Sequence, residues 1–172
     1  MNRGGLNIDY ADGFKLEEQG FKRYYKAIKH VLNATEIEST ARTMIDKSTG
    51  VDLTAKIQGQ CVGVSLRVRN RDYNSFTLNR HVSDKHSEVN KWLTKRNNFI
   101  KPATHLQLAP TKNGLKVWRI DIDAFSHFIQ RQINQSKISS YYNSRMMCYE
   151  FTHSDVSGVA GVSVFELDNS FT

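Results

Sequence analysis

One short stretch carries the residues best suited to chemistry, GVDLTAKIQGQCVGVSLRVR, residues 50–69. Asp52 lies on its first strand-like half, and Ser65, Arg67 and Arg69 alternate with apolar residues on its second half. Side chains of a strand point to opposite faces in turn, so these three polar residues are expected to share one face. The intervening QGQ predicts a tight turn, and the stretch is therefore expected to form a β-hairpin with one core face and one polar face.

A hairpin with this pattern offers the parts needed to hydrolyse a phosphodiester bond. That reaction uses a hard divalent cation bound by carboxylates, and a nearby positive group that stabilises developing charge. Asp52 is the candidate ligand for Mg²⁺ or Mn²⁺, Asp46 is the nearest further acid, and Arg67 is the candidate cation. An alternative interpretation makes both aspartates turn or strand-end residues that accept backbone hydrogen bonds, and the arginines a solvated strand face.

Other reaction classes lack their motifs. The sequence contains no G-x-S-x-G elbow, no P-loop and no dinucleotide-binding glycine pattern. His81 and His86 are five residues apart and do not make the two close ligand pairs that zinc sites use. The two cysteines exclude a disulfide framework and favour a reducing, cytoplasmic location. No segment approaches the length of a membrane span, so no membrane partner is expected.

The positive charge of the chain is concentrated in its middle. The formal net charge is +7, and residues 65–131 hold 13 Lys and Arg against 5 Asp and Glu. The remaining residues hold 11 basic against 12 acidic side chains, so they are close to neutral. Clustered basic charge is typical of proteins that bind a polyanion, and it favours a nucleic-acid partner over a merely solubilising surface.

The periodicity of the chain predicts one domain, residues 1–172, with an α/β (α+β) fold. The tight hairpin excludes a purely parallel sheet, so a mixed central β-sheet flanked by helices is expected. Apolar spacing predicts a first helix over 14–33, and Asp123 is expected to cap another. Residues 37–45 fit a strand or a helix, and residues 87–96 a short helix. The remaining strands are expected at 50–57, 61–69, 75–81, 104–110, 115–122, 146–151 and 161–167. The strand at 75–81 is expected to follow the hairpin as its third strand.

Residues 50–69 resemble the core of the PD-(D/E)XK nucleases, the restriction-endonuclease-like superfamily. In that family the aspartate of a GxD strand is followed, after a turn, by a strand with an (E/D/Q)-x-K triplet. Asp52 matches the aspartate, Ser65 the acidic or glutamine position, and Arg67 the lysine position. The resemblance implies a nuclease-like core over about 14–133 with a C-terminal extension over 134–172. Ser65 supplies no carboxylate, and Arg67 is a poorer proton acceptor than lysine.

The resemblance implies a Mg²⁺- or Mn²⁺-dependent endonuclease that cuts DNA, with a homodimer as one way to cut both strands. Asp52 would bind the metal, Ser65 would ligate it through water or position the nucleophile, and Arg67 would stabilise the phosphate. The upstream acids that would complete the site are Glu18, Glu36, Glu38 and Asp46. The residues that would hold the DNA backbone are Arg69, Arg71, Arg80, Lys91, Lys95 and Arg96. Two alternatives stay open, a nuclease-like protein that binds nucleic acid without cutting it, and a small inhibitor or recruiting protein.

Overall fold

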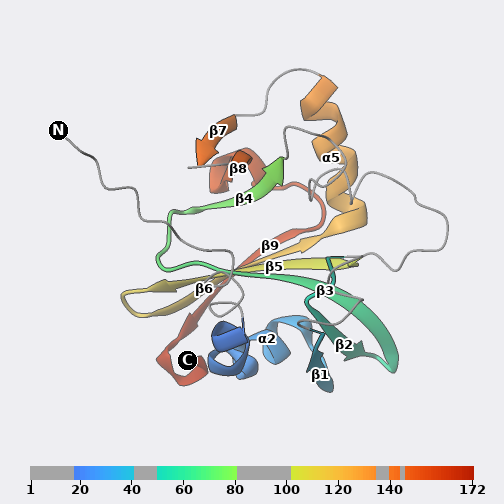
Figure 1. Ribbon diagram of the computed structural model, residues 1–172, viewed down its shortest axis with the longest axis vertical. Coiled ribbons are helices and arrows are strands. Elements are labelled where there is room, and N and C mark those ends of the chain that lie inside the picture. Colours follow the sequence, from blue (N-terminus) through green and yellow to red (C-terminus); the bar gives the residue numbers. More distant parts are fainter. Residues whose placement is uncertain (1–17, 41–49, 81–101, 135–139, 144–145) are drawn as a thin grey trace.

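The computed structural model describes residues 18–40, 50–80, 102–134, 140–143 and 146–172, which form two β-sheets with helices on either side (Figure 1). The six-stranded sheet, called the large sheet, has the order β1-β2-β3-β5-β6-β9, and the small sheet has the order β4-β8-β7. The strands are β1 Glu36–Ser39, β2 Leu53–Ile57, β3 Gln60–Val68, β4 Ser75–Arg80, β5 Thr104–Thr111, β6 Gly114–Asp121, β7 Ser140–Asn143, β8 Met146–Thr152 and β9 Val162–Asp168. The helices are α2 Tyr25–Leu32, α5 Ile122–Asn134, α6 His153–Val156 and the 3₁₀ helix η1 Asn169–Phe171.

The predicted α+β class is confirmed, because helices flank a mixed and mostly antiparallel central sheet. Only β3 and β5 pair in parallel in the large sheet. Helix α2 lies on one side of this sheet, and the small sheet lies with α5 on the other side (Figure 1). No helix among the described residues is long and apolar enough to cross a membrane.

The first helix forms because its apolar residues recur at helical spacing. Residues 18–23 are also helical, and the bond from the amide of Ile28 to the carbonyl of Tyr24, 2.9 Å, carries the hydrogen-bond pattern into α2. One face is buried against β2, β3 and β5. That face consists of Tyr24, Ala27, Ile28, Val31 and Leu32. The helix ends at Asn33, whose left-handed φ of 52° makes a C-terminal cap.

The second core lies between the large sheet and the small sheet. Phe76 of β4 is fully buried and packs against Trp118 of β6, with ring centroids 5.4 Å apart, and against Phe125 of α5, at 5.5 Å. Phe151 of β8 stacks on Phe76 at 5.0 Å. Both faces of the large sheet are therefore covered along β3, β5 and β6, and this determines where the polar residues of the hairpin lie.

The hairpin forms in the predicted register, but its second face is not open. Val64 and Leu66 are buried on the α2 side, as predicted, and Gly59 takes a φ of 82° in the turn. Ser65 was expected outside the core, yet only 6% of it is exposed. That expectation is wrong because β4 does not extend the hairpin as a third strand. Instead it pairs with β8 and brings the small sheet over this face.

Two further boundaries differ from the prediction. The helix expected to be capped by Asp123 begins at Ile122, and the capping acceptor is Asp121, whose Oδ1 accepts from the amide of Ala124 at 2.9 Å. Residues 134–172, expected as an extension to the core, supply β7, β8 and β9, which belong to both sheets. At the C-terminal end, hydrogen bonds from the hydroxyl and amide of Ser170 lower the pKa of Asp168. The helix expected over 87–96 lies outside the described residues.

Candidate functional site

Asp52, the predicted metal ligand, completes the backbone pairing of the hairpin. Its amide donates to the carbonyl of Val64 at 2.9 Å, and Val64 is also the ladder partner of Leu53, so the β2–β3 pairing is irregular where β2 begins. Its carboxylate Oδ2 then accepts the amide of Leu66 at 2.5 Å. The side chain thus replaces the next backbone carbonyl that a longer strand would have supplied, and Asp52 acts at this position as a strand-end residue.

We expect Asp52→Ala to lower the free energy of unfolding by about 1–3 kcal/mol, because the amide of the buried Leu66 loses its acceptor. Asp52→Asn keeps an acceptor oxygen and should cost less. Urea unfolding of the two variants measures the difference. Equal stability of the alanine variant and the wild type would show that the bond to Leu66 contributes nothing.

Ser65 faces His105 of the neighbouring parallel strand. The Oγ of Ser65 and the Nδ1 of His105 are 3.1 Å apart, and both residues are buried. A hydroxyl beside an imidazole is a pair known from nucleophilic catalysis, but a nucleophile must also reach its substrate. With Ser65 at 6% exposed and His105 at 0%, the described arrangement fits a hydrogen-bonded polar pair in the interior.

One edge of β4 does not pair with β8. It is hydrogen-bonded by side chains of the large sheet and its adjoining loop, namely Arg67, Arg69 and Gln107. Nη1 of Arg67 donates to the carbonyl of Thr77 at 2.7 Å, and Nη2 of Arg69 donates to the Thr77 hydroxyl. The Gln107 amide both accepts from the amide of Thr77, at 3.2 Å, and donates to the carbonyl of Ser75, at 2.9 Å. Two arginines occupy alternate positions on this face because Arg67, like Gln107, binds the backbone of β4, and Arg69 binds the Thr77 side chain.

The predicted acids do not gather around Asp52 within the described residues. Glu36 lies opposite Lys56 and contacts it at 3.4 Å, four residues along β2 from Asp52, or about 13 Å at 3.3 Å per residue. Glu38 lies opposite Thr54 and is exposed. Asp46 lies outside the described residues. No group of three or more His, Cys, Asp or Glu side chains in the described part of the chain could hold a metal ion.

The residues predicted to hold nucleic acid are separated by the structure. Arg69 is turned inward onto Thr77, whereas Arg71 is exposed in the loop between β3 and β4. Arg80 ends β4, and its side chain is not among those described. Lys91, Lys95 and Arg96 lie outside the described residues. Among the predicted contacts, Arg71 is therefore the cation that the structure places at the surface.

Sequence reasoning missed a basic surface on the first helix. This basic helix face is made of Lys22, Arg23, Lys26, Lys29 and His30. Their spacing of one, three, three and one residues places them on a single stripe, opposite the apolar stripe that contacts the large sheet. The signal was present in the sequence, because the same helical periodicity that predicts the buried face also predicts the exposed one.

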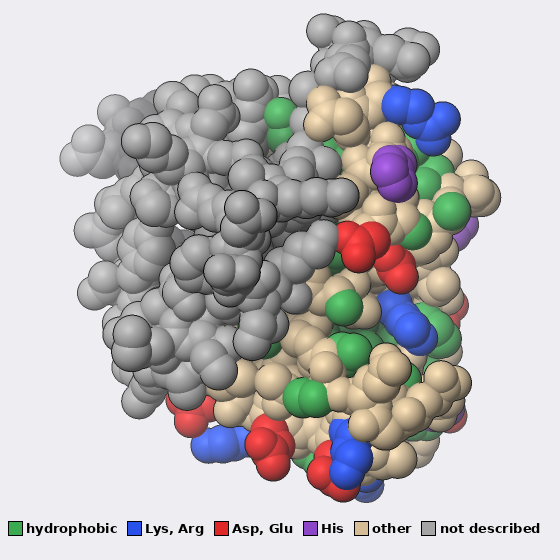
Figure 2. All heavy atoms as spheres, turned by 90° about the vertical axis from the view of Figure 1, so that its right-hand side faces the viewer, with side chains coloured by type: hydrophobic (Ala, Val, Ile, Leu, Met, Phe, Trp, Pro, Cys, Tyr) green, Lys and Arg blue, Asp and Glu red, His purple; other side chains and the backbone are tan. Residues whose placement is uncertain are grey.

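The basic helix face contrasts with another part of the surface. On the face shown in Figure 2, the described acidic and basic side chains are interspersed. Such interspersion suits a solvated surface, and pairs like Lys56 and Glu36 contribute little to stability. The segregated positive charge on the first helix is the more informative feature.

No family model matches the sequence, and neither a curated protein nor a solved structure is found to match it.

Proposed function

We propose that this protein binds DNA, and that the basic helix face contacts the phosphate backbone. The observation that carries the proposal is the segregation of charge on the first helix. Residues 18–33 contain four Lys and Arg and one acid, and the basic side chains share the face turned away from the large sheet. Among the described helices, α2 covers this side of the large sheet (Figure 1), and a long polyanion could lie along its outer face.

Ordinary helix electrostatics account for only part of this charge. Lys29 and His30 lie in the last turn of α2, where cations favour the carbonyl end of the helix. Lys22 contacts Glu18 at 3.3 Å in an exposed pair of small energetic value. Arg23 and Lys26 form no ion pair with another described residue, and neither is near the carbonyl end. These two side chains lie together on an exposed surface, and a row of phosphates would relieve their repulsion.

The rigidity of the helix supports phosphate binding. The face opposite the cations is fully buried in the core, so the backbone that carries them is fixed before binding. Phosphate contacts supply essentially all of non-specific DNA affinity. The net charge of +7 adds long-range attraction for any DNA sequence.

Fluorescence anisotropy with a labelled 20-base-pair duplex, at about 50 mM salt, tests the proposal. We expect binding at micromolar concentrations or tighter, which competing unlabelled duplex reverses and which weakens as salt rises. An acidic polypeptide of similar charge serves as the control for a general attraction to polyanions. Absence of duplex binding at low salt, or equal affinity for the acidic polypeptide, would refute the proposal.

Metal-dependent DNA cleavage is a second candidate, favoured by one observation. Asp52 directly precedes β2, Arg67 lies on the neighbouring β3, and regular alternation would place both on the same face of the hairpin, the relation that the nuclease resemblance requires. The described residues hold no group of three or more potential metal ligands, so further ligands such as Asp46 would be needed. Supercoiled plasmid incubated with Mg²⁺ or Mn²⁺ tests this candidate. Cleavage that EDTA stops and that Asp52→Asn abolishes would support it, and an intact plasmid would refute it.

A further inference from the structure

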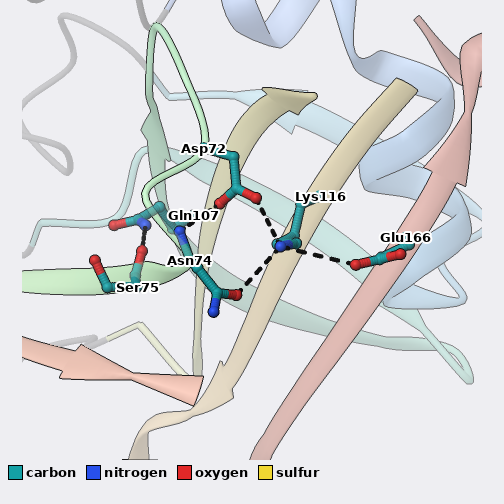
Figure 3. A network of polar contacts seen from close by, with 6 residues as sticks. All are labelled: Asp72, Asn74, Ser75, Gln107, Lys116 and Glu166. Atoms are coloured by element: carbon teal, nitrogen blue, oxygen red, sulfur yellow. Dashed lines mark hydrogen bonds and ion pairs between the residues drawn. The ribbon is translucent and has the colours of Figure 1, made fainter. Parts of the chain in front are cut away.

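The loop between β3 and β4, residues 69–74, is fixed to the body of the protein through alternate side chains. Nζ of Lys116 on β6 contacts the carboxylate of Asp72 at 2.6 Å and the side-chain oxygen of Asn74 at 3.3 Å. Figure 3 shows Lys116 between these two residues and Glu166 of β9, which is 3.7 Å away. The Asp72 carboxylate also accepts the amide of Asn74 at 2.7 Å, so the loop is bound to the sheet and closed on itself.

The residues between these anchors are presented to solvent. Arg71 is exposed, and Tyr73 is 46% exposed, the highest value among the large hydrophobic side chains of the described residues. The guanidinium of Arg71 lies 4.6 Å from the centroid of the Tyr73 ring, and that of Arg69 lies 5.8 Å from it. An aromatic ring with cationic groups around it is therefore held outward by a loop whose conformation is already set.

Burial does not explain this arrangement. A tyrosine ring that served the core would be packed, and the two hydrophobic cores of the protein do not include Tyr73. Asp72 and Asn74 hold the loop, whereas the ring contacts of Tyr73 are with Arg71 and Arg69 of the loop itself. The side chains that do not fix the loop are the pair that could contact a ligand.

We infer that Arg71 and Tyr73 form a stacking site for an unpaired base of a nucleic acid. The inference rests on the proposed DNA binding and adds that single-stranded or locally opened DNA is the preferred substrate. Proteins that bind single strands combine cationic groups, which follow the backbone, with aromatic rings on which bases stack. Arg71 supplies the charge and can itself stack on a base, and Tyr73 supplies the ring. Paired bases inside a duplex present no free face to such a ring.

The start of the first helix lies next to the start of the loop. A side chain at Gly20, in the first turns of the helix, would come within 2.5 Å of Val68, so the helix and the end of β3 touch there. Val68 ends β3 directly before the loop. A strand of nucleic acid held by the helix could therefore continue toward Tyr73. Because the loop is already fixed in its conformation, binding the nucleic acid there costs less entropy.

The test compares two labelled oligonucleotides at equal salt, a 20-nucleotide oligothymidine and a 20-base-pair duplex, by fluorescence anisotropy. We expect Tyr73→Ala to weaken oligothymidine binding by about tenfold or more, with duplex binding changed by less than about twofold. Tyr73→Phe, the matched control, keeps the ring and should retain wild-type affinity for both. Thermal unfolding of each variant checks that this exposed position leaves the fold intact.

Each other outcome has a separate meaning. Wild-type protein that binds neither oligonucleotide would refute the proposed function and the inference with it. Duplex binding with an oligothymidine affinity that Tyr73→Ala does not change would overturn the stacking site and leave DNA binding standing. The same result is expected if Arg71 and Tyr73 contact a protein partner, so that alternative also counts against the inference.

Discussion

Replacing Arg23, Lys26 and Lys29 together by alanine should weaken duplex DNA binding by about a hundredfold at about 100 mM salt. Each lost phosphate contact removes the favourable release of counterions from DNA. The losses of affinity from the three contacts multiply. The three side chains point away from the core of the large sheet, and alanine favours the helical conformation. The variant should therefore fold normally, which far-UV circular dichroism and thermal unfolding can check.

A matched control separates the position of the charge from its amount. Lys56, Lys112 and Arg131 are exposed on β2, the β5–β6 turn and α5, and replacing them by alanine removes the same charge from other surfaces. This control should weaken binding by only a few-fold, through the general field of the protein. Equal losses in the two triple variants would mean that net charge alone attracts the DNA, and the basic helix face would have no special role.

Gln107→Ala should lower the free energy of unfolding by on the order of 2–5 kcal/mol, the largest stability effect expected of a polar residue here. The side chain is buried and makes two bonds to the β4 backbone, with the amide of Thr77 and the carbonyl of Ser75. Each buried backbone group left without a partner costs about 1–3 kcal/mol. The loss should appear in urea unfolding as a lower midpoint with an unchanged slope.

The chain offers a matched glutamine for comparison. Gln60 begins β3 and is exposed, so Gln60→Ala should change stability by no more than about 0.5 kcal/mol. If Gln107→Ala were as mild as Gln60→Ala, the contact between Gln107 and β4 would not hold the two sheets together. The interpretation of Arg67 and Arg69 as interlayer residues would then lose its support as well.

Local pattern was enough to predict most elements of this fold. The strict alternation around Val64 and Leu66 predicted β3 and its core face, and the spacing of Tyr24, Ile28 and Val31 predicted the first helix. These features depend on neighbours within a few residues, so a single sequence reveals them. The turn at Gly59 was equally local, because a positive φ favours glycine.

Pairing between distant strands could not be predicted in this way. Strand β4 looked like a continuation of the hairpin, yet its partner is β8, about seventy residues later. Nothing in residues 75–80 indicates that pairing, which depends on the whole chain. The error carried over to the site, because arginines at alternate positions of a strand are expected to face solvent unless a second layer covers them. Here the small sheet covers Arg67 and Arg69 and binds them through Thr77.

The candidate site shows the same difference between features that depend on near neighbours in the sequence and features that depend on distant ones. The sequence left two interpretations of Asp52 open, a metal ligand and a strand-end residue that accepts a backbone amide. Only the position of the Leu66 amide, 2.5 Å from the carboxylate, shows which partner the described structure provides. The basic helix face, in contrast, could be predicted from helical periodicity alone.

The slope of duplex affinity against salt tests the central claim most directly, because it counts the phosphates that the basic helix face contacts. Plots of log Kd against log salt concentration, from about 50 to about 300 mM, should differ in slope between wild type and the Arg23, Lys26 and Lys29 triple variant. Each lost phosphate contact changes the slope by about 0.9, so a difference of about 2 to 3 is expected. Parallel lines would contradict the account, because they would show that these side chains contact no phosphate.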